Sequence, residues 1–193
     1  MTVLPLCCFP NAAWLRAYQS DNEVVIDIGE HYAKQTYRNR FDILGPNGVL
    51  TLSIPVVGQK GEKTSMKDIE IERGKWQQEH LNSIVTAYNS APFAEHFLHE
   101  MEDLFKSPPE RLIDFNTKAL ALSLDWLGLE SKHRISEVYV DEFDTDMRSS
   151  QKRREGDGFN QYLQVFSDRF DFQGNLSAMD LAMNNGPSGV TLI

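Results

Sequence analysis

The sequence contains only two cysteines, Cys7 and Cys8, and they are neighbours. Adjacent cysteines cannot join distant segments through a disulfide, and they lack the C-x-x-C spacing of metal and redox sites. We interpret them as small apolar side chains of a buried strand, with a reactive thiol as the alternative. The chain also has no apolar run of about 18 residues, so we expect no membrane span.

Positive charge is scarce as well. The 193 residues include 28 acidic and 19 basic side chains, which gives a formal net charge of -9. Affinity for a phosphate backbone requires clustered cations, so this balance argues against a general nucleic-acid binder. The exception is the stretch 32–41, YAKQTYRNRF, which contains Lys34, Arg38 and Arg40. This stretch is the first candidate for a binding site.

The composition is typical of a folded protein. Hydrophobic residues make up 41% of the chain and charged residues 24%, which is too apolar for a disordered protein. The first ten residues, MTVLPLCCFP, have neither a basic residue before the apolar run nor an Ala-x-Ala cleavage pattern after it. We therefore predict a cytoplasmic protein.

Hydrophobic periodicity predicts a single mixed α/β domain over residues 1–193, in which a sheet with a β-hairpin packs against several helices. An α+β arrangement is the alternative. The expected sheet contains an N-terminal strand and strands at 23–28, 37–44, 49–56 and 135–140.

Helical spacing of apolar residues predicts helices after Asn11, from Trp76, after Pro92, from 107 to 128 and after Ser177. Residues 141–158 contain acids, then basic residues, and hardly any apolar residue. That segment is expected to be an exposed, mobile loop.

Two arginines on one strand face form the main candidate site. In a strand over 37–44, period-two geometry places Arg38 and Arg40 on one face, with Tyr37 and Asn39 on the other. Each guanidinium presents a planar fork that fits a carboxylate or a phosphate. The alternative is a solvated face on which Arg40 pairs with nearby acids. Spacing alone leaves both interpretations open.

The histidines suggest weaker sites. His80 lies in the apolar stripe of its helix, where a histidine is either a core residue with one hydrogen-bond partner or a proton-transfer group. His96 and His99 share a helix face with Asp103, but the order H-F-L-H-E matches no zinc signature. We predict no metal site.

Six segments follow one another in a recognisable order: 35–40 (QTYRNR), 52–56 (LSIPV), 75–81 (KWQ with His80-Leu81), 87–93 (AYNSAPF), 114–116 (DFN) and 175–187 (NLS, DL and NNGP). In this order they resemble the WbqC-like proteins of bacteria, in the version of Bacteroidetes-type bacteria. The resemblance covers nearly the whole chain.

The resemblance implies a role in bacterial surface-polysaccharide (O-antigen) biosynthesis, since the family's namesake belongs to such gene clusters. It also implies an acyl or aminoacyl transferase, and a pocket shared by the Tyr-Arg-Asn-Arg signature at 37–40 with Trp76 and His80. Many relatives have His-Gln-Pro-Asn-Tyr-Leu-Pro-Trp after the first strand, whereas this chain has Cys8-Phe9 where the His and Gln are expected. If that His is the general base, this protein uses His80 or another group, or has lost the chemistry.

These observations give a working hypothesis. Arg38 and Arg40 hold an anionic or sugar-nucleotide-like substrate, and His80 acts as acid or base; the further binding residues are Asn39, Asn11, Tyr37 and Trp76. The competing hypothesis is a non-catalytic ligand-binding or assembly protein of an envelope pathway, with the 141–158 loop docking a protein partner. The sequence identifies neither the substrate nor a cofactor.

Overall fold

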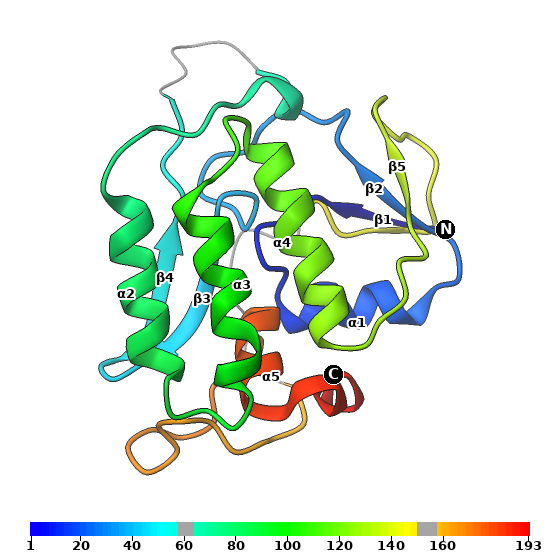
Figure 1. Ribbon diagram of the computed structural model, residues 1–193. Coiled ribbons are helices and arrows are strands. Elements are labelled where there is room, and N and C mark those ends of the chain that lie inside the picture. The colour runs from blue at the N-terminus through cyan, green and yellow to red at the C-terminus, as the bar shows by residue number, and fades with distance from the viewer. Residues whose placement is uncertain (58–63, 150–157) are drawn as a thin grey trace.

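The computed structural model describes residues 1–57, 64–149 and 158–193 (Figure 1). The chain begins with two parallel strands joined by a helix. Strand β1 (Thr2–Pro5) leads through α1 (Ala12–Ser20) to β2 (Val24–Asp27), which pairs with β1 in parallel. The predicted strand, turn, helix and strand are all present. Asn11 begins the helix, because its side chain accepts a hydrogen bond from the backbone N–H of Trp14.

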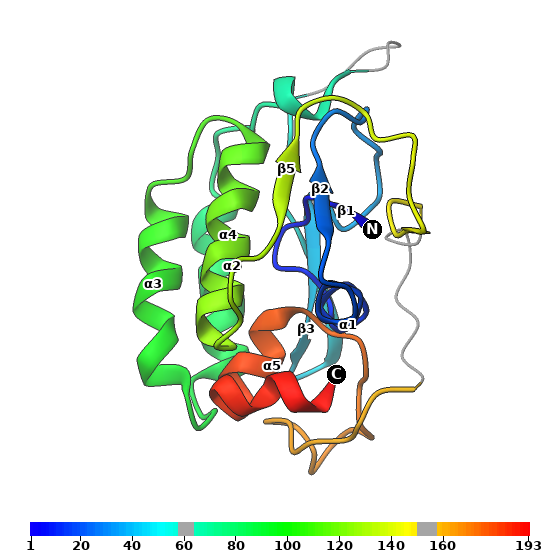
Figure 2. The ribbon, with the colours of Figure 1, turned by 90° about the vertical axis from the view of Figure 1, so that its right-hand side faces the viewer.

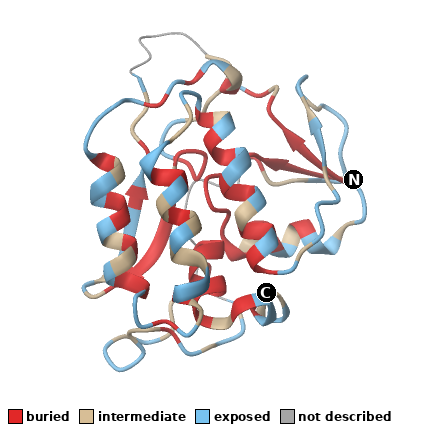
Figure 3. Cartoon of the chain, viewed as in Figure 1, coloured by how far each residue is buried: buried red, intermediate tan, exposed pale blue. Residues whose placement is uncertain are grey.

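Two short strands from the C-terminal half complete this sheet. β5 (Arg134–Ser136) pairs with β2, and β6 (Thr145–Asp146) pairs with β1, so the order is β5-β2-β1-β6 and every pair is parallel. The two central strands are buried along their whole length, as parallel strands covered on both faces are (Figure 3). The carboxyl ends of all four strands therefore lie along one edge.

The hairpin forms a separate sheet. β3 (Arg40–Gly45) pairs antiparallel with β4 (Gly48–Ser53), and neither joins the parallel sheet. The prediction of one common sheet is wrong on this point, because alternation identifies strands but not their partners. The predicted start of the first arm is also wrong: Tyr37, Arg38 and Asn39 form turns before the strand, so period-two geometry does not apply to Arg38 and Arg40.

Three long helices pack together as one layer, seen on the left of Figure 2. They are α2 (Trp76–Tyr88), α3 (Ala94–Lys106) and α4 (Leu112–Trp126). α2 packs against β3 and α3, and α3 packs against α4. A 3-10 turn, η1 (Met66–Asp68), precedes this layer, and α5 (Ala178–Asn185) and the 3-10 helix η2 (Gly186–Leu192) end the chain. The mixed α/β fold class is confirmed.

The segment 141–158 differs in part from the expected exposed loop. It contains β6, and Arg148 is buried, with 6% of its surface exposed. A two-residue strand has no periodicity of its own, so its pairing with β1 could not be read from the sequence. Residues 150–157, where the predicted mobile loop continues, lie outside the described residues. The strand expected at 135–140 is limited to Arg134–Ser136.

Candidate functional site

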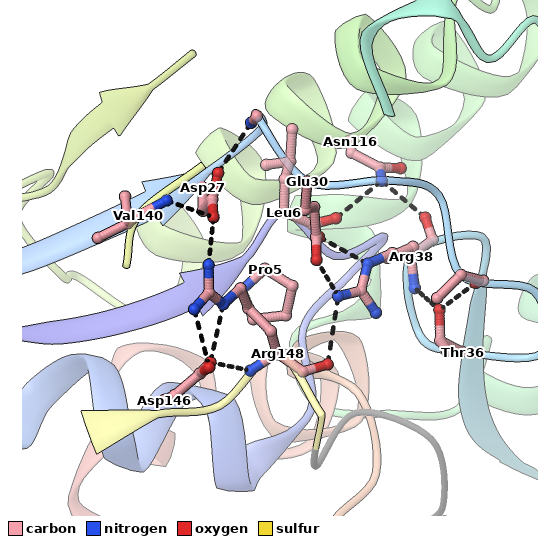
Figure 4. A network of polar contacts seen from close by, with 12 residues as sticks. Pro5, Leu6, Asp27, Glu30, Thr36, Arg38, Asn116, Val140, Asp146 and Arg148 are labelled. Atoms are coloured by element: carbon pink, nitrogen blue, oxygen red, sulfur yellow. Dashed lines mark hydrogen bonds and ion pairs between the residues drawn. The ribbon is translucent and has the colours of Figure 1, made fainter. Parts of the chain in front are cut away.

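Charged side chains gather at the carboxyl edge of the parallel sheet. Asp27 ends β2, Glu30 follows it, and Asp146 and Arg148 lie at the end of β6 (Figure 4). In open parallel sheets ligands bind outside the carboxyl ends of the strands. The candidate site is therefore built around this edge.

Arg38 is held there by Glu30. Its Nε and Nη2 donate to the two carboxylate oxygens at 2.7 and 2.5 Å, and Nη2 also donates to the backbone oxygen of Arg148 at 3.2 Å (Figure 4). Only 2% of Arg38 is exposed. Burial raises the pKa of Glu30, and the guanidinium opposes that shift. A cation paired in this way is neutralised within the protein, so Arg38 shapes the edge and does not by itself supply charge for a ligand.

Arg148 forms the second buried ion pair of this edge. Its Nη1 donates to Asp27 at 2.5 Å, and its Nε and Nη2 donate to Asp146, each at 2.9 Å. The guanidinium also lies 4.2 Å from the ring centroid of Tyr139. Burial would raise the pKa of Asp146, but the hydrogen bonds from Arg148 outweigh it and lower the pKa. Asp27, Asp146 and Arg148 thus fix β6 against β2.

Arg40 differs from both of these arginines. It is partly exposed, and within residues 1–57, 64–149 and 158–193 it forms no ion pair with a carboxylate. Its Nε is buried and, like Nη1 of Arg38, has no hydrogen-bond partner in the same part of the chain. Arg40 is therefore the arginine of this region best suited to meet an anion. Burial raises the pKa of the nearby Tyr32 phenol, and the charges of Arg40 and Arg38 oppose the shift.

Three predicted binding residues already use polar groups within the fold. The Tyr37 hydroxyl donates to Asp42 at 2.6 Å, and Asn11 caps α1. Asn39 donates through Nδ2 to the backbone oxygen of Ile54 at 2.9 Å, while its buried Oδ1 has no partner within the described residues. Of these three, Asn39 has a buried acceptor oxygen without a partner in the described residues, and it precedes Arg40 in the chain.

His80 and Trp76 lie in the helix layer. The Nε2 atom of His80 is 3.1 Å from the backbone oxygen of Ser53, and its ring packs against Trp76 and Phe41. Burial lowers the pKa of His80. Adjacent residues of a strand point to opposite faces. The Phe41 side chain lies on the face of β3 that packs against His80, so the Arg40 side chain lies on the other face. The structure thus groups His80 with Trp76 in an aromatic cluster and directs the Arg40 side chain to the other face of β3.

The two positions at which the resemblance to the family implies His and Gln belong to the core. Cys8 and Phe9 are buried, and burial raises the pKa of Cys8 well above its usual value and that of Cys7 to about 12. Both thiols are therefore protonated near neutral pH, which argues against a reactive cysteine. The Phe9 ring packs between those of Phe41 and Trp126, at centroid distances of 5.1 and 6.1 Å.

Sequence reasoning missed five residues of this edge: Asp27, Glu30, Tyr32, Asp146 and Arg148. An acid at the end of a short β-branched strand was a usable signal for Asp27, and Tyr32 belongs to the stretch already singled out. No sequence signal marked Arg148, because its partner Asp27 lies 121 positions away.

No group of His, Cys, Asp and Glu in the described residues is arranged to hold a metal ion, and His96 and His99 are exposed.

Comparison with known proteins identifies the family. The model of the WbqC-like protein family matches residues 9–156, so the chain belongs to this family and the resemblance inferred from the sequence is confirmed. Neither the curated proteins nor the solved structures gave a match. Within the described residues, no helix combines the length and apolar character needed to cross a membrane.

Proposed function

We propose that the protein takes part in bacterial surface-polysaccharide biosynthesis as an acyl or aminoacyl transferase acting on an anionic, sugar-nucleotide-like substrate. Membership of the WbqC-like family supports the pathway. The observation that carries the binding site is Arg40, whose buried Nε has no partner within the described residues. The substrate's phosphate groups lie against this guanidinium, because a guanidinium fork matches phosphate oxygens.

The neighbouring groups complete a binding surface of mixed character. The Tyr32 phenol donates to a phosphate or sugar oxygen, and the free Oδ1 of Asn39 accepts from a sugar hydroxyl. Arg38 is a positioning residue, since its ion pair with Glu30 fixes the turn that precedes Arg40. Such positioning and charge stabilisation support group transfer without a covalent enzyme intermediate.

The transfer itself needs a base. The acceptor amine or hydroxyl attacks the donor carbonyl, the new acyl bond forms, the bond to the leaving group breaks, and the acceptor proton passes to a base. His80 is the candidate, because its lowered pKa keeps the imidazole neutral at pH 7. His80 lies on the side of β3 opposite to Arg40, so this role requires the contact of Nε2 with Ser53 to open and the acceptor to reach Nε2 across the strand.

A second candidate function is non-catalytic ligand binding or assembly in an envelope pathway. It is favoured by Cys8 and Phe9, which stand where relatives have His and Gln and are fully packed into the core. On this alternative Arg40 binds the same ligand without turnover, and the segment 141–158 docks a protein partner.

Binding is tested by thermal unfolding with UDP-N-acetylglucosamine, UDP and inorganic phosphate as probes. The parent and Arg73→Gln, which removes an exposed arginine of the loop before α2, are expected to be stabilised by the two nucleotides, and Arg40→Gln is not. Equal stabilisation of Arg40→Gln and the parent would overturn the site. Mass spectrometry of UDP-N-acetylglucosamine with an acyl-CoA or aminoacyl donor then separates the alternatives, since only a transferase yields an acylated product.

A further inference from the structure

A pocket of about 300 Å³ lies between α4 and β5. Most of the lining side chains are apolar. They come from α4, from β2 and the residue after β1, and from β5 and the loop before it: Leu6, Ile26, Leu120, Leu124, Leu129 and Ile135. Polar side chains also line it, among them Asp125, Ser131 and His133. A mainly apolar cavity with a few polar groups is the usual composition of a small-molecule site.

The pocket exists because the parallel sheet is incompletely covered. Parallel sheets normally carry helices over both faces, yet Ile135 of β5 is 48% exposed. The space is too small for another helix, whose diameter is about 10 Å. A cavity of roughly 150 Å³ accommodates benzene, so a pocket of about 300 Å³ fits a bicyclic ring or a ring with a short chain.

The hydrogen bonds of Tyr18 determine the tautomer of His133. The Tyr18 hydroxyl lies 3.0 Å from the backbone oxygen of Glu130, 2.9 Å from the backbone N–H of Lys132 and 3.1 Å from Nδ1 of His133. A carbonyl oxygen only accepts and a backbone N–H only donates, so all three contacts are satisfied when the hydroxyl proton goes to Glu130 and Nδ1 of His133 donates to the hydroxyl oxygen.

This assignment leaves Nε2 of His133 as the hydrogen-bond acceptor of a neutral imidazole. Burial lowers the pKa of His133, which supports the neutral form at pH 7. None of the hydrogen bonds among the described residues uses Nε2. The pocket is thus lined by apolar side chains and by one oriented imidazole whose acceptor is available.

We propose that this pocket binds a small aromatic or alicyclic molecule that carries one hydroxyl or amine group, which donates a hydrogen bond to Nε2 of His133. The apolar body of the ligand lies against Leu120, Leu124 and Ile135. The lining of this pocket includes none of Arg38, Arg40 and Arg148, and the proposal does not depend on the proposed transferase activity.

The location is tested with 2-naphthol and naphthalene as probes, titrated into the whole chain by ligand-observed NMR. Ala121→Phe places a ring in the pocket from an exposed position of α4, whereas Lys118→Phe adds the same ring to α4 outside the pocket. Both probes are expected to bind the parent and Lys118→Phe and to lose at least about tenfold in affinity for Ala121→Phe. Absence of binding to the parent at millimolar concentration, or equal binding by Ala121→Phe, overturns the proposal.

The role of the imidazole is tested with His133→Phe, which retains a ring and removes the acceptor. The ratio of 2-naphthol to naphthalene affinity is expected to fall about two- to tenfold, the effect of one neutral hydrogen bond. An unchanged ratio overturns the assignment of Nε2. Nitrogen-15 NMR of the unliganded protein gives an independent readout: a His133 signal of the Nδ1–H tautomer is expected, and an Nε2–H tautomer contradicts the proposal.

Discussion

Arg38 and Glu30 form an ion pair with two hydrogen bonds inside the protein. The sequence alone did not indicate that either side chain is buried. The Nε and Nη2 atoms of Arg38 lie 2.7 and 2.5 Å from the carboxylate oxygens of Glu30, and 2% and 6% of the two residues are exposed. Removing one partner of such a pair leaves an uncompensated buried charge, which costs more than the intact pair contributes.

Glu30→Gln is therefore expected to lower the free energy of unfolding by about 3–5 kcal/mol, measured by urea denaturation. The control is Glu102→Gln, which breaks the exposed pair between Glu102 and Lys106 and should leave stability unchanged within error. The double variant Glu30→Leu with Arg38→Met should recover much of the loss, because it buries no charge. A Glu30→Gln variant as stable as the control would show that Arg38 finds solvent or another partner.

Acid should destabilise the protein through two histidines, His80, which is buried, and His133, which is half-buried. Burial lowers the pKa of His80 and His133 from 6.5, so the unfolded chain takes up protons at a higher pH than the folded protein does. Their neutral forms therefore support the folded state above pH 6.5, and this support is lost as the pH falls from 6.5 through the lowered folded-state values. Urea denaturation at pH 7.5 and 5.5 measures the effect. The double variant His80→Phe with His133→Phe should show a smaller loss, and an equal loss would assign the acid sensitivity to other groups.

Gly29 is required by the close approach of the segment after β5. A Cβ atom at this position would lie 2.3 Å from the backbone nitrogen of Tyr139 and 2.3 Å from the backbone carbon of Val138. Gly29→Ala is expected to cost about 1–3 kcal/mol, because backbone atoms cannot rotate away. In Gly74→Ala the Cβ atom would lie 3.9 Å from Cδ1 of Trp76, so this variant should change stability by no more than about 0.5 kcal/mol.

Limited proteolysis distinguishes the cause of this loss. The backbone N–H of Val140 donates to Asp27 at 3.2 Å, which ties the segment to the carboxyl edge. Displacing it should speed cleavage between 137 and 143 in Gly29→Ala relative to Gly74→Ala. Equal cleavage would mean that the segment absorbs the extra methyl group.

Local patterns were sufficient to predict the helices and the hairpin. The four-residue spacing of Trp76, His80, Ile84 and Tyr88 predicted α2, and all four side chains are buried as that spacing requires. The alternation on both sides of Gly45–Gly48 predicted β3 and β4. Each of these signals lies within one turn or one strand pair, so the sequence contains the whole interaction.

The site required contacts between distant segments. Arg38 was assigned to a strand because the alternation of 40–45 extends backward by eye, but the chain turns at 36–39 and directs the guanidinium to Glu30. The partner of β1 on its other side, β6, has two residues and no pattern. Which carboxylates neutralise which arginines depends on how the parallel sheet is completed, and that information is not present in any local window.

Phe9 occupies the position at which the resemblance to the family implies Gln, and its surroundings predict the effect of a Phe9→Gln substitution. Phe9 is buried with a left-handed φ of 45°, and its ring packs against Phe41 and Trp126. Phe9→Gln loses these contacts and buries an amide among aromatic rings, so it should lower the free energy of unfolding by at least about 3 kcal/mol. Leu163→Gln, at a position that is 80% exposed, is the control and should have no measurable effect. If urea denaturation instead shows Phe9→Gln to be as stable as the parent, the site can accept a polar side chain, and the argument for a non-catalytic protein loses its main support.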